Sequence, residues 1–157
     1  MKQYCYRSPL GLIRLVSDQQ KLRQLTFVNE EFNSEQDEII GQTIEYLDCY
    51  FSHKPLPALP PYEQSCSPFA SEVYELTATI PYGTVRKYGE IASLIAQRRG
   101  IRRLSAQAVG QALKKNQLMI IIPCHRVIGA DGEMVGFAGG IERKRALLAH
   151  EGFSAKS

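Results

Sequence analysis

The sequence contains no long apolar run and no recognisable export signal. Its longest stretch of large apolar residues, LMIII at positions 118–122, is far shorter than the roughly 20 residues that a membrane-spanning helix needs. The first residues, MKQYCYRSPL, lack the apolar core of a signal peptide. We therefore expect a cytoplasmic protein with no part in a membrane.

Cysteine is scarce and widely spaced. The four cysteines, Cys5, Cys49, Cys66 and Cys124, form no C-x-x-C pair and no framework of the secreted disulfide type, so we expect free thiols. Cys49 and His53 would share one face of a helix, and Cys5 could join them as a metal ligand. Because a complete tetrahedral set of ligands is not visible, we predict no metal site.

Charge is distributed unevenly along the chain. Residues 1–61 carry 6 Lys and Arg against 8 Asp and Glu, whereas residues 62–157 carry 13 against 8. Five prolines between positions 55 and 68 remove backbone hydrogen-bond donors from the segment between the two parts. We predict an N-terminal unit with its connector at 1–61 and a second unit at 62–157, and the second is the expected partner of a polyanion.

The first unit reads as a small sheet followed by a helix. Alternating residues and turn signals predict antiparallel strands at 4–8, 10–18 and 22–29. Ser34 is a suitable cap for a helix that ends near His53, because apolar residues recur there with helical spacing. This unit contains no group of residues that is typical of a catalytic site.

The second unit reads as mostly helical. Helices are expected at 68–80 and 88–97, and a third, capped by Ser105, at 106–115. The last two form a helix-turn-helix with an enlarged basic turn. Residues 117–122 read as a buried strand that a proline ends.

The third of these helices has unusually small side chains, at Ala106, Ala108, Gly110 and Ala112. The minor groove of DNA is only about 6 Å wide, so a helix that enters it must carry small side chains on the inserted face. Close packing against another helix explains the same pattern. The surrounding residues 86–115 carry eight Lys and Arg against one acid, which favours DNA.

A thiol, Cys124, stands beside a base and a cation, His125 and Arg126. A nucleophilic cysteine needs such groups to populate its thiolate, although a lone cysteine can also be an inert core residue. Neighbouring side chains on a strand point to opposite faces, so contact between Cys124 and His125 requires a turn or a bridging water.

Glu151 stands at the end of the last helix, before Gly152, where the helix dipole disfavours an anion. A hydrogen bond to a histidine would compensate, and the alternative is a surface carboxylate at a frayed end. The glycine-rich stretch GADGEMVGFAGG contains no phosphate-binding motif, and we interpret it as the wall of a pocket.

The motifs IPCHRVIG, GFAGG and LLAHEG, after a helix-turn-helix and KN, resemble the O6-alkylguanine-DNA alkyltransferases, or methylated-DNA-protein-cysteine methyltransferases. The resemblance is specific over about Ser67 to Phe153. It implies an α/β protein: a small N-terminal ribonuclease-H-like antiparallel sheet with a helix, joined to a mostly helical C-terminal domain with a helix-turn-helix.

The implied activity is DNA repair by direct, stoichiometric transfer of an alkyl group to a cysteine, which inactivates the protein irreversibly. The implied substrate is double-stranded DNA that carries O6-alkylguanine, and also O4-alkylthymine. The resemblance implies no cofactor, a monomer, and association with the nucleoid when the protein is on DNA.

The resemblance also implies roles for individual residues. Cys124 accepts the alkyl group, His125 activates it through a water, and Glu151 orients His125. Asn116 braces the segment before the thiol, and Tyr88 hydrogen-bonds the extruded guanine. The residues that match the nucleotide pocket are Met119, Val127, Phe137, Ala138 and Gly139, with Lys144 as a buried lysine near the site. The residues expected to contact DNA are Ser105, Ala106, Gln107, Ala108, Gly110, Arg102, Arg103 and Arg126.

The sequence departs from the family pattern at three places. Gln107 stands where the family commonly has the arginine that fills the gap left by a flipped base, the turn before it is longer, and Phe137 stands where tyrosine is frequent. Two other classes compete with this interpretation. A non-enzymatic lesion binder would lack the reactive thiol, and a cysteine hydrolase would need a better dyad than adjacent Cys and His.

Overall fold

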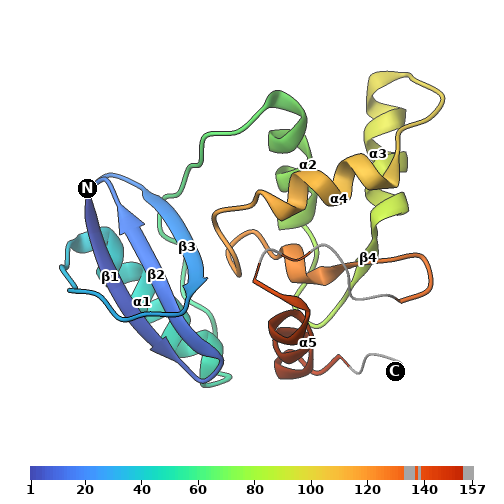
Figure 1. Cartoon of the computed structure of the whole chain (residues 1–157). Coiled ribbons are helices and arrows are strands. Elements are labelled where there is room, and N and C mark those ends of the chain that lie inside the picture. The colour runs from blue at the N-terminus through green and yellow to red at the C-terminus, as the bar shows by residue number, and fades with distance from the viewer. Residues whose placement is uncertain (133–136, 138, 154–157) are drawn as a thin grey trace. The chain divides into compact units, whose positions relative to one another are not determined.

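The computed structural model describes residues 1–132, 137 and 139–153 (Figure 1). The chain divides into two compact units, Met1–Ser65 and Cys66–Ser157. The boundary that the sequence suggested, after residue 61, lies in the same proline-rich connector. No helix among the described residues combines the length and the apolar character needed to cross a membrane.

The first unit is an antiparallel sheet with one helix against it. Strands β1 (Lys2–Ser8), β2 (Gly11–Ser17) and β3 (Leu22–Val28) follow one another in the sheet in chain order, as predicted. Helix α1 (Glu38–Phe51) packs on it, and the Tyr6 hydroxyl donates to Asp48 Oδ1 across that contact at 2.6 Å. The fully buried aliphatic side chains of this unit include Ile13, Leu15, Leu22, Leu25, Ile40 and Leu47.

The start of α1 differs from the prediction. Asp37, and not Ser34, caps the helix, and its carboxylate accepts from the backbone N–H of Ile40. The Ser34 hydroxyl oxygen accepts instead from the backbone N–H of Cys5, and Glu35 N–H donates to the Gln3 carbonyl. The segment before α1 is therefore held along β1, and the helix begins only where the chain leaves that strand.

The second unit is built from helices around a short parallel strand pair. Its elements are α2 (Pro68–Ala78), β4 (Arg86–Lys87), α3 (Tyr88–Arg99), α4 (Ala106–Lys114), a 3-10 turn η1 (Cys124–Arg126), β5 (Val127–Ile128) and α5 (Ile141–His150). Helices α2, α3 and α4 pack against one another (Figure 1). The predicted caps are confirmed, since the Ser67 and Ser105 hydroxyl oxygens accept from backbone N–H groups at the starts of α2 and α4.

The strand predicted at residues 117–122 is wrong. The segment Leu118–Ile122 is buried, but it has only an isolated β-bridge at Leu118 followed by a turn, in which Ile120 has a φ of +70°. The Asn116 side chain supplies hydrogen bonds to the backbone of this segment. Its oxygen accepts from Leu118 N–H, and its amide nitrogen donates to the carbonyl of Ile122 at 3.0 Å. The run of β-branched residues therefore reflects burial rather than pairing in a sheet.

Candidate active site

Cys124 is the first residue of η1, directly after the buried turn, and not at the end of a strand. Its side chain is only 2% exposed, and the Asn116 amide donates to Sγ at 3.3 Å. Burial raises the pKa of the thiol to about 11, while the Asn116 hydrogen bond and the Lys144 charge oppose that rise. Because burial disfavours the thiolate, we expect the resting cysteine to be a neutral thiol at pH 7.

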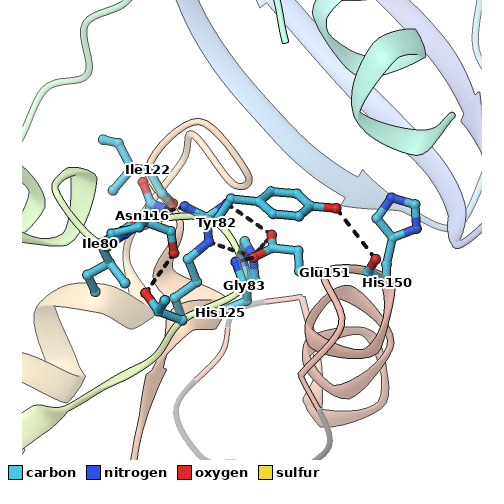
Figure 2. Close-up of polar contacts among 11 residues, drawn as sticks. Ile80, Tyr82, Gly83, Asn116, Ile122, His125, His150 and Glu151 are labelled. Atoms are coloured by element: carbon cyan, nitrogen blue, oxygen red, sulfur yellow. Dashed lines mark hydrogen bonds and ion pairs between the residues drawn. The ribbon is translucent and has the colours of Figure 1, made fainter. Parts of the chain in front are cut away.

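His125 is the next residue, and the 3-10 turn places its ring in the interior. Its Nε2 lies 2.7 Å from Glu151 Oε2, which is the contact that the sequence predicted (Figure 2). Because a carboxylate only accepts, Nε2 carries the proton and Nδ1 is the basic nitrogen of the neutral ring. Nδ1 is buried and has no hydrogen-bond partner among the described residues. Burial lowers the pKa of His125, against the raising effect of Glu151.

Glu151 lies at the C-cap of α5, and its carboxylate is fully buried. Besides His125, it accepts from Arg126 Nε at 2.7 Å, from Arg126 Nη2 at 3.0 Å and from the backbone N–H of Gly83 at 3.2 Å. An anion at this end of a helix opposes the helix dipole, so the carboxylate needs compensation. Arg126 supplies most of it, whereas the sequence suggested only the histidine.

Arg126 therefore has a different place from the one expected. Its side chain is largely buried, it also donates to the Ile80 carbonyl at 2.8 Å, and the ring of Tyr82 lies 5.7 Å from its guanidinium carbon. A guanidinium held in this way by a carboxylate and a carbonyl is not available to a phosphate. These contacts place Arg126 beside Glu151, which it supports, and they do not favour the expected contact with DNA.

Tyr82 and Gly83 belong to the loop after α2, and sequence reasoning missed them as part of the site. Gly83 has a φ of +79°, and a Cβ there would lie 3.2 Å from the Glu151 carbonyl oxygen. Both facts favour glycine, because a side chain would be strained and would press on the backbone of Glu151. The available signal was the sequence PYG at positions 81–83, directly after the helix predicted at 68–80.

A buried lysine and tyrosine lie on the other side of the turn. Lys144 Nζ donates to the Val127 carbonyl at 2.5 Å and to the Tyr88 hydroxyl at 3.1 Å. Burial lowers the pKa of Lys144 to about 8, while burial and the nearby Cys124 raise the pKa of Tyr88 to about 12. The Tyr88 ring also lies 3.8 Å from the Cβ position of Gly110, so it connects α3, α4 and α5.

The structure brings part of the expected nucleotide pocket close to the thiol. Met119 is buried in the segment before η1 and Val127 directly after η1, and the Phe137 ring stands edge-on to His125 with centroids 6.4 Å apart. Gly139 lies in the turn before α5. Ala138 lies outside the described residues.

The residues expected to contact DNA lie on α4 and the turn before it. Ser105, Ala106 and Gln107 are exposed, and Ala108 and Gly110 are half-buried. Arg102 and Arg103 are exposed in the turn. Arg99, by contrast, is directed back to α2, where Nε lies 3.3 Å from Glu72 Oε1 and the guanidinium carbon lies 5.5 Å from the Phe69 ring centroid.

Cys5 and Cys49 are half-buried free thiols in the first unit. In the part of the chain that the structure describes, no three His, Cys, Asp or Glu side chains form a group that could hold a metal ion.

A neutral buried thiol beside a histidine–carboxylate pair, behind a helix-turn-helix, defines a DNA-binding protein with a candidate cysteine nucleophile. Comparison with known proteins agrees. The family model for the 6-O-methylguanine DNA methyltransferase DNA-binding domain matches residues 68–153, and the model for the ribonuclease-like domain of the same family matches residues 1–58. The chain belongs to the 6-O-methylguanine DNA methyltransferase family.

Individual relatives cover nearly the whole chain. The methylated-DNA–protein-cysteine methyltransferase of Saccharolobus solfataricus is 38% identical over 148 residues, which is 94% of this chain and 93% of the relative. The structure of the O6-methylguanine methyltransferase of Mycobacterium tuberculosis matches with a TM-score of 0.81 and 33% identity, covering 96% of this chain and 92% of that one. A complex of the mycobacterial protein with DNA matches with a TM-score of 0.84 at the same identity and coverage.

Proposed function

We propose that Cys124 is the acceptor in the reaction of this family, which repairs DNA by transferring an alkyl group to a protein cysteine. The observation that carries the assignment is the arrangement around the thiol. The adjacent His125 has its Nε2 committed to Glu151, and its basic Nδ1 is buried without a partner among the described residues. An imidazole in this state can take up the proton of a neighbouring thiol, directly or through one water.

The proposed step is a single displacement. The thiol proton passes to Nδ1 of His125, the sulfur forms a bond to the alkyl carbon, and the bond from that carbon to guanine O6 breaks with its electron pair on the base. Glu151 then stabilises the resulting imidazolium. The product is a thioether with no leaving group, so the protein reacts once and no cofactor is required.

Tyr88 and Lys144 are assigned to the departing guanine. With its pKa raised to about 12, the Tyr88 hydroxyl keeps its proton and can donate a hydrogen bond to the negative charge that develops on the base. Lys144 donates to the Tyr88 oxygen, which makes that hydroxyl a stronger donor. Asn116 is assigned to hold both the turn and Sγ in place, since its amide donates to each.

The partner is DNA, and the proposed substrate is duplex DNA that carries O6-alkylguanine, with O4-alkylthymine as a second lesion. A damaged base must leave the stack to reach a buried thiol, and this is easiest for a weakly paired base. The small side chains of α4 suit the narrow minor groove of DNA. Gln107 then fills the gap that the flipped base leaves, and Arg102 and Arg103 contact phosphates. We expect the protein to act as a monomer in the cytoplasm, at the nucleoid.

Intact mass spectrometry after mixing the protein with duplex DNA containing O6-methylguanine tests the proposal. The expected result is a gain of one methyl group per chain, located on Cys124, with no further repair when more DNA is added. Cys124→Ser should bind the same DNA and transfer nothing. Turnover, or methylation of the exposed Cys66 in place of Cys124, would contradict the assignment.

A further inference from the structure

The first unit contains a hollow on its sheet, formed without any residue of the active site. It has a volume of about 490 Å³, within the range of sites for small molecules. The residues that line it are Gln3, Arg14, Val28, Asn29, Glu30, Glu31 and Phe32. They come from all three strands and from the segment after β3.

Arg14 is the unusual member of this lining. It lies on the central strand, opposite Cys5 on β1 and Thr26 on β3, and its guanidinium carbon lies 5.8 Å from the centroid of the Phe32 ring. Its Nε is buried and has no hydrogen-bond partner among the described residues. A buried N–H of a charged group is costly to leave unpaired, so an acceptor from outside the described chain is expected here.

The charges of the wall restrict what this acceptor can belong to. Glu31 is already committed, because its carboxylate forms an ion pair with Arg7. Glu30 is exposed at the rim and has no ion pair with another described residue. One unpaired cation and one unpaired anion therefore face the hollow. The net negative charge of residues 1–61, with 6 Lys and Arg against 8 Asp and Glu, disfavours a polyanion.

We propose that this hollow binds a small zwitterion, the size of an amino acid or dipeptide. Its carboxylate accepts from Arg14 Nε and the adjacent guanidinium nitrogen, which is the fork geometry that carboxylates match. Its ammonium group faces Glu30, and its body lies between Val28 and Phe32. The site is separate from the alkyl-transfer chemistry and does not rest on the role assigned to Cys124.

The test uses the full chain and follows the Arg14 Nε–H signal in ¹H–¹⁵N NMR spectra during titration with glycylglycine. The signal is identified by its loss in Arg14→Lys. We expect a saturable shift with glycylglycine, a weaker response to acetate, which lacks the ammonium group, and none to ethylammonium. Arg14→Lys, with binding then followed by backbone amide shifts, should weaken binding at least about tenfold because it keeps the charge and loses the fork.

Two further variants separate this proposal from its competitors. Arg23→Lys is the matched control, since Arg23 lies in the same sheet but is already paired with Asp18, and it should leave binding unchanged. Glu30→Gln should weaken glycylglycine binding and should not weaken acetate binding, because acetate has no ammonium group for Glu30 to pair with. If Glu30→Gln strengthened the binding of glycylglycine as well as that of acetate, Arg14 and Glu30 would be partners of each other and the proposal would be overturned. Equal affinity for acetate and glycylglycine, or no saturable shift with glycylglycine up to about 50 mM, would also overturn it.

Discussion

The two units of the molecule differ in how far their ion-paired side chains are exposed to solvent. In the first, the ion pairs Arg7–Glu31, Lys21–Glu63 and Arg23–Asp18 join side chains that are all at least 22% exposed. In the second, Glu151 and His125 are fully buried and Arg126 nearly so. Among the described residues, the ionisable side chains classed as buried polar are His125, Arg126, Lys144 and Glu151, all in the second unit.

The difference shows which unit carries the chemistry. Taking a charge out of water is so unfavourable that buried ions persist only where partners hold them. Surface pairs contribute little to stability and need no functional reason. The second unit therefore contains buried charged side chains that an ordinary apolar core would lack. These side chains lie around the Cys124 thiol. In the first unit, the buried side-chain atoms that have no hydrogen-bond partner among the described residues are Arg14 Nε and Asp37 Oδ2.

The largest expected effect comes from breaking the buried ion pair. Glu151→Gln leaves the Arg126 guanidinium buried without its anion, which should lower the free energy of unfolding of the second unit by about 3–5 kcal/mol. Glu31→Gln, which breaks a surface pair in the first unit, should cause no measurable loss. Differential scanning calorimetry compares the two variants.

A double variant checks the cause of that loss. Glu151→Gln combined with Arg126→Met removes both charges, so much of the stability should return, although transfer activity should not. Equal destabilisation by Glu151→Gln and Glu31→Gln would show that burial does not distinguish the two pairs.

The next expected effect is on the rate of methyl transfer and not on the stability of the protein. His125→Ala removes the proposed base, so methyl transfer from duplex O6-methylguanine should slow by roughly 10²–10⁴-fold, as is typical for loss of general base catalysis. DNA affinity should be nearly unchanged, because the ring is fully buried beneath the surface of the second unit. Single-turnover kinetics and a binding titration give the two quantities. A wild-type rate and pH profile in His125→Ala would remove the proton-transfer assignment.

Reactivity of the free thiols toward iodoacetamide gives a third comparison. Cys66 is exposed and should be labelled first at pH 7, while Cys124 is buried and neutral and should react far more slowly. Because burial raises the pKa of Cys124 to about 11, its thiolate fraction should grow about tenfold with each pH unit from 7 to 10.

Peptide mass spectrometry of labelled native protein measures both rates. Cys124→Ser is the control that shows the background signal for labelling at position 124. A labelling rate at Cys124 that levels off near pH 8 would mean that the thiol is already activated in the free protein.

Local features of the fold could be predicted from the sequence. The strands of the first unit and the caps Ser67 and Ser105 depend on residues a few positions apart, and these predictions are confirmed. The partner of His125 could also be inferred, since Glu151 was an anion at the wrong end of a helix.

Features that depend on contacts between distant segments could not be predicted in this way. Residues 117–122 have strand-like composition, but among the described residues they form no strand, and the Asn116 side chain hydrogen-bonds the backbone of Leu118 and Ile122. The resemblance placed Arg126 among the residues expected to contact DNA. Its actual partners, Glu151 and Ile80, are 25 and 46 positions away in the chain.

The smallest expected effect belongs to Gln107, which stands exposed at the start of α4. If it fills the gap that a flipped base leaves, it should hydrogen-bond the orphaned cytosine, because an amide offers both a donor and an acceptor. Gln107→Ala should then slow repair of duplex DNA several-fold, about 1 kcal/mol, and Gln107→Arg should repair at least as fast as wild type, because arginine is longer, charged and planar. Single-stranded DNA has no gap, so neither variant should change its repair. Equal slowing of both substrates by Gln107→Ala would shift the role to the exposed arginines of the turn.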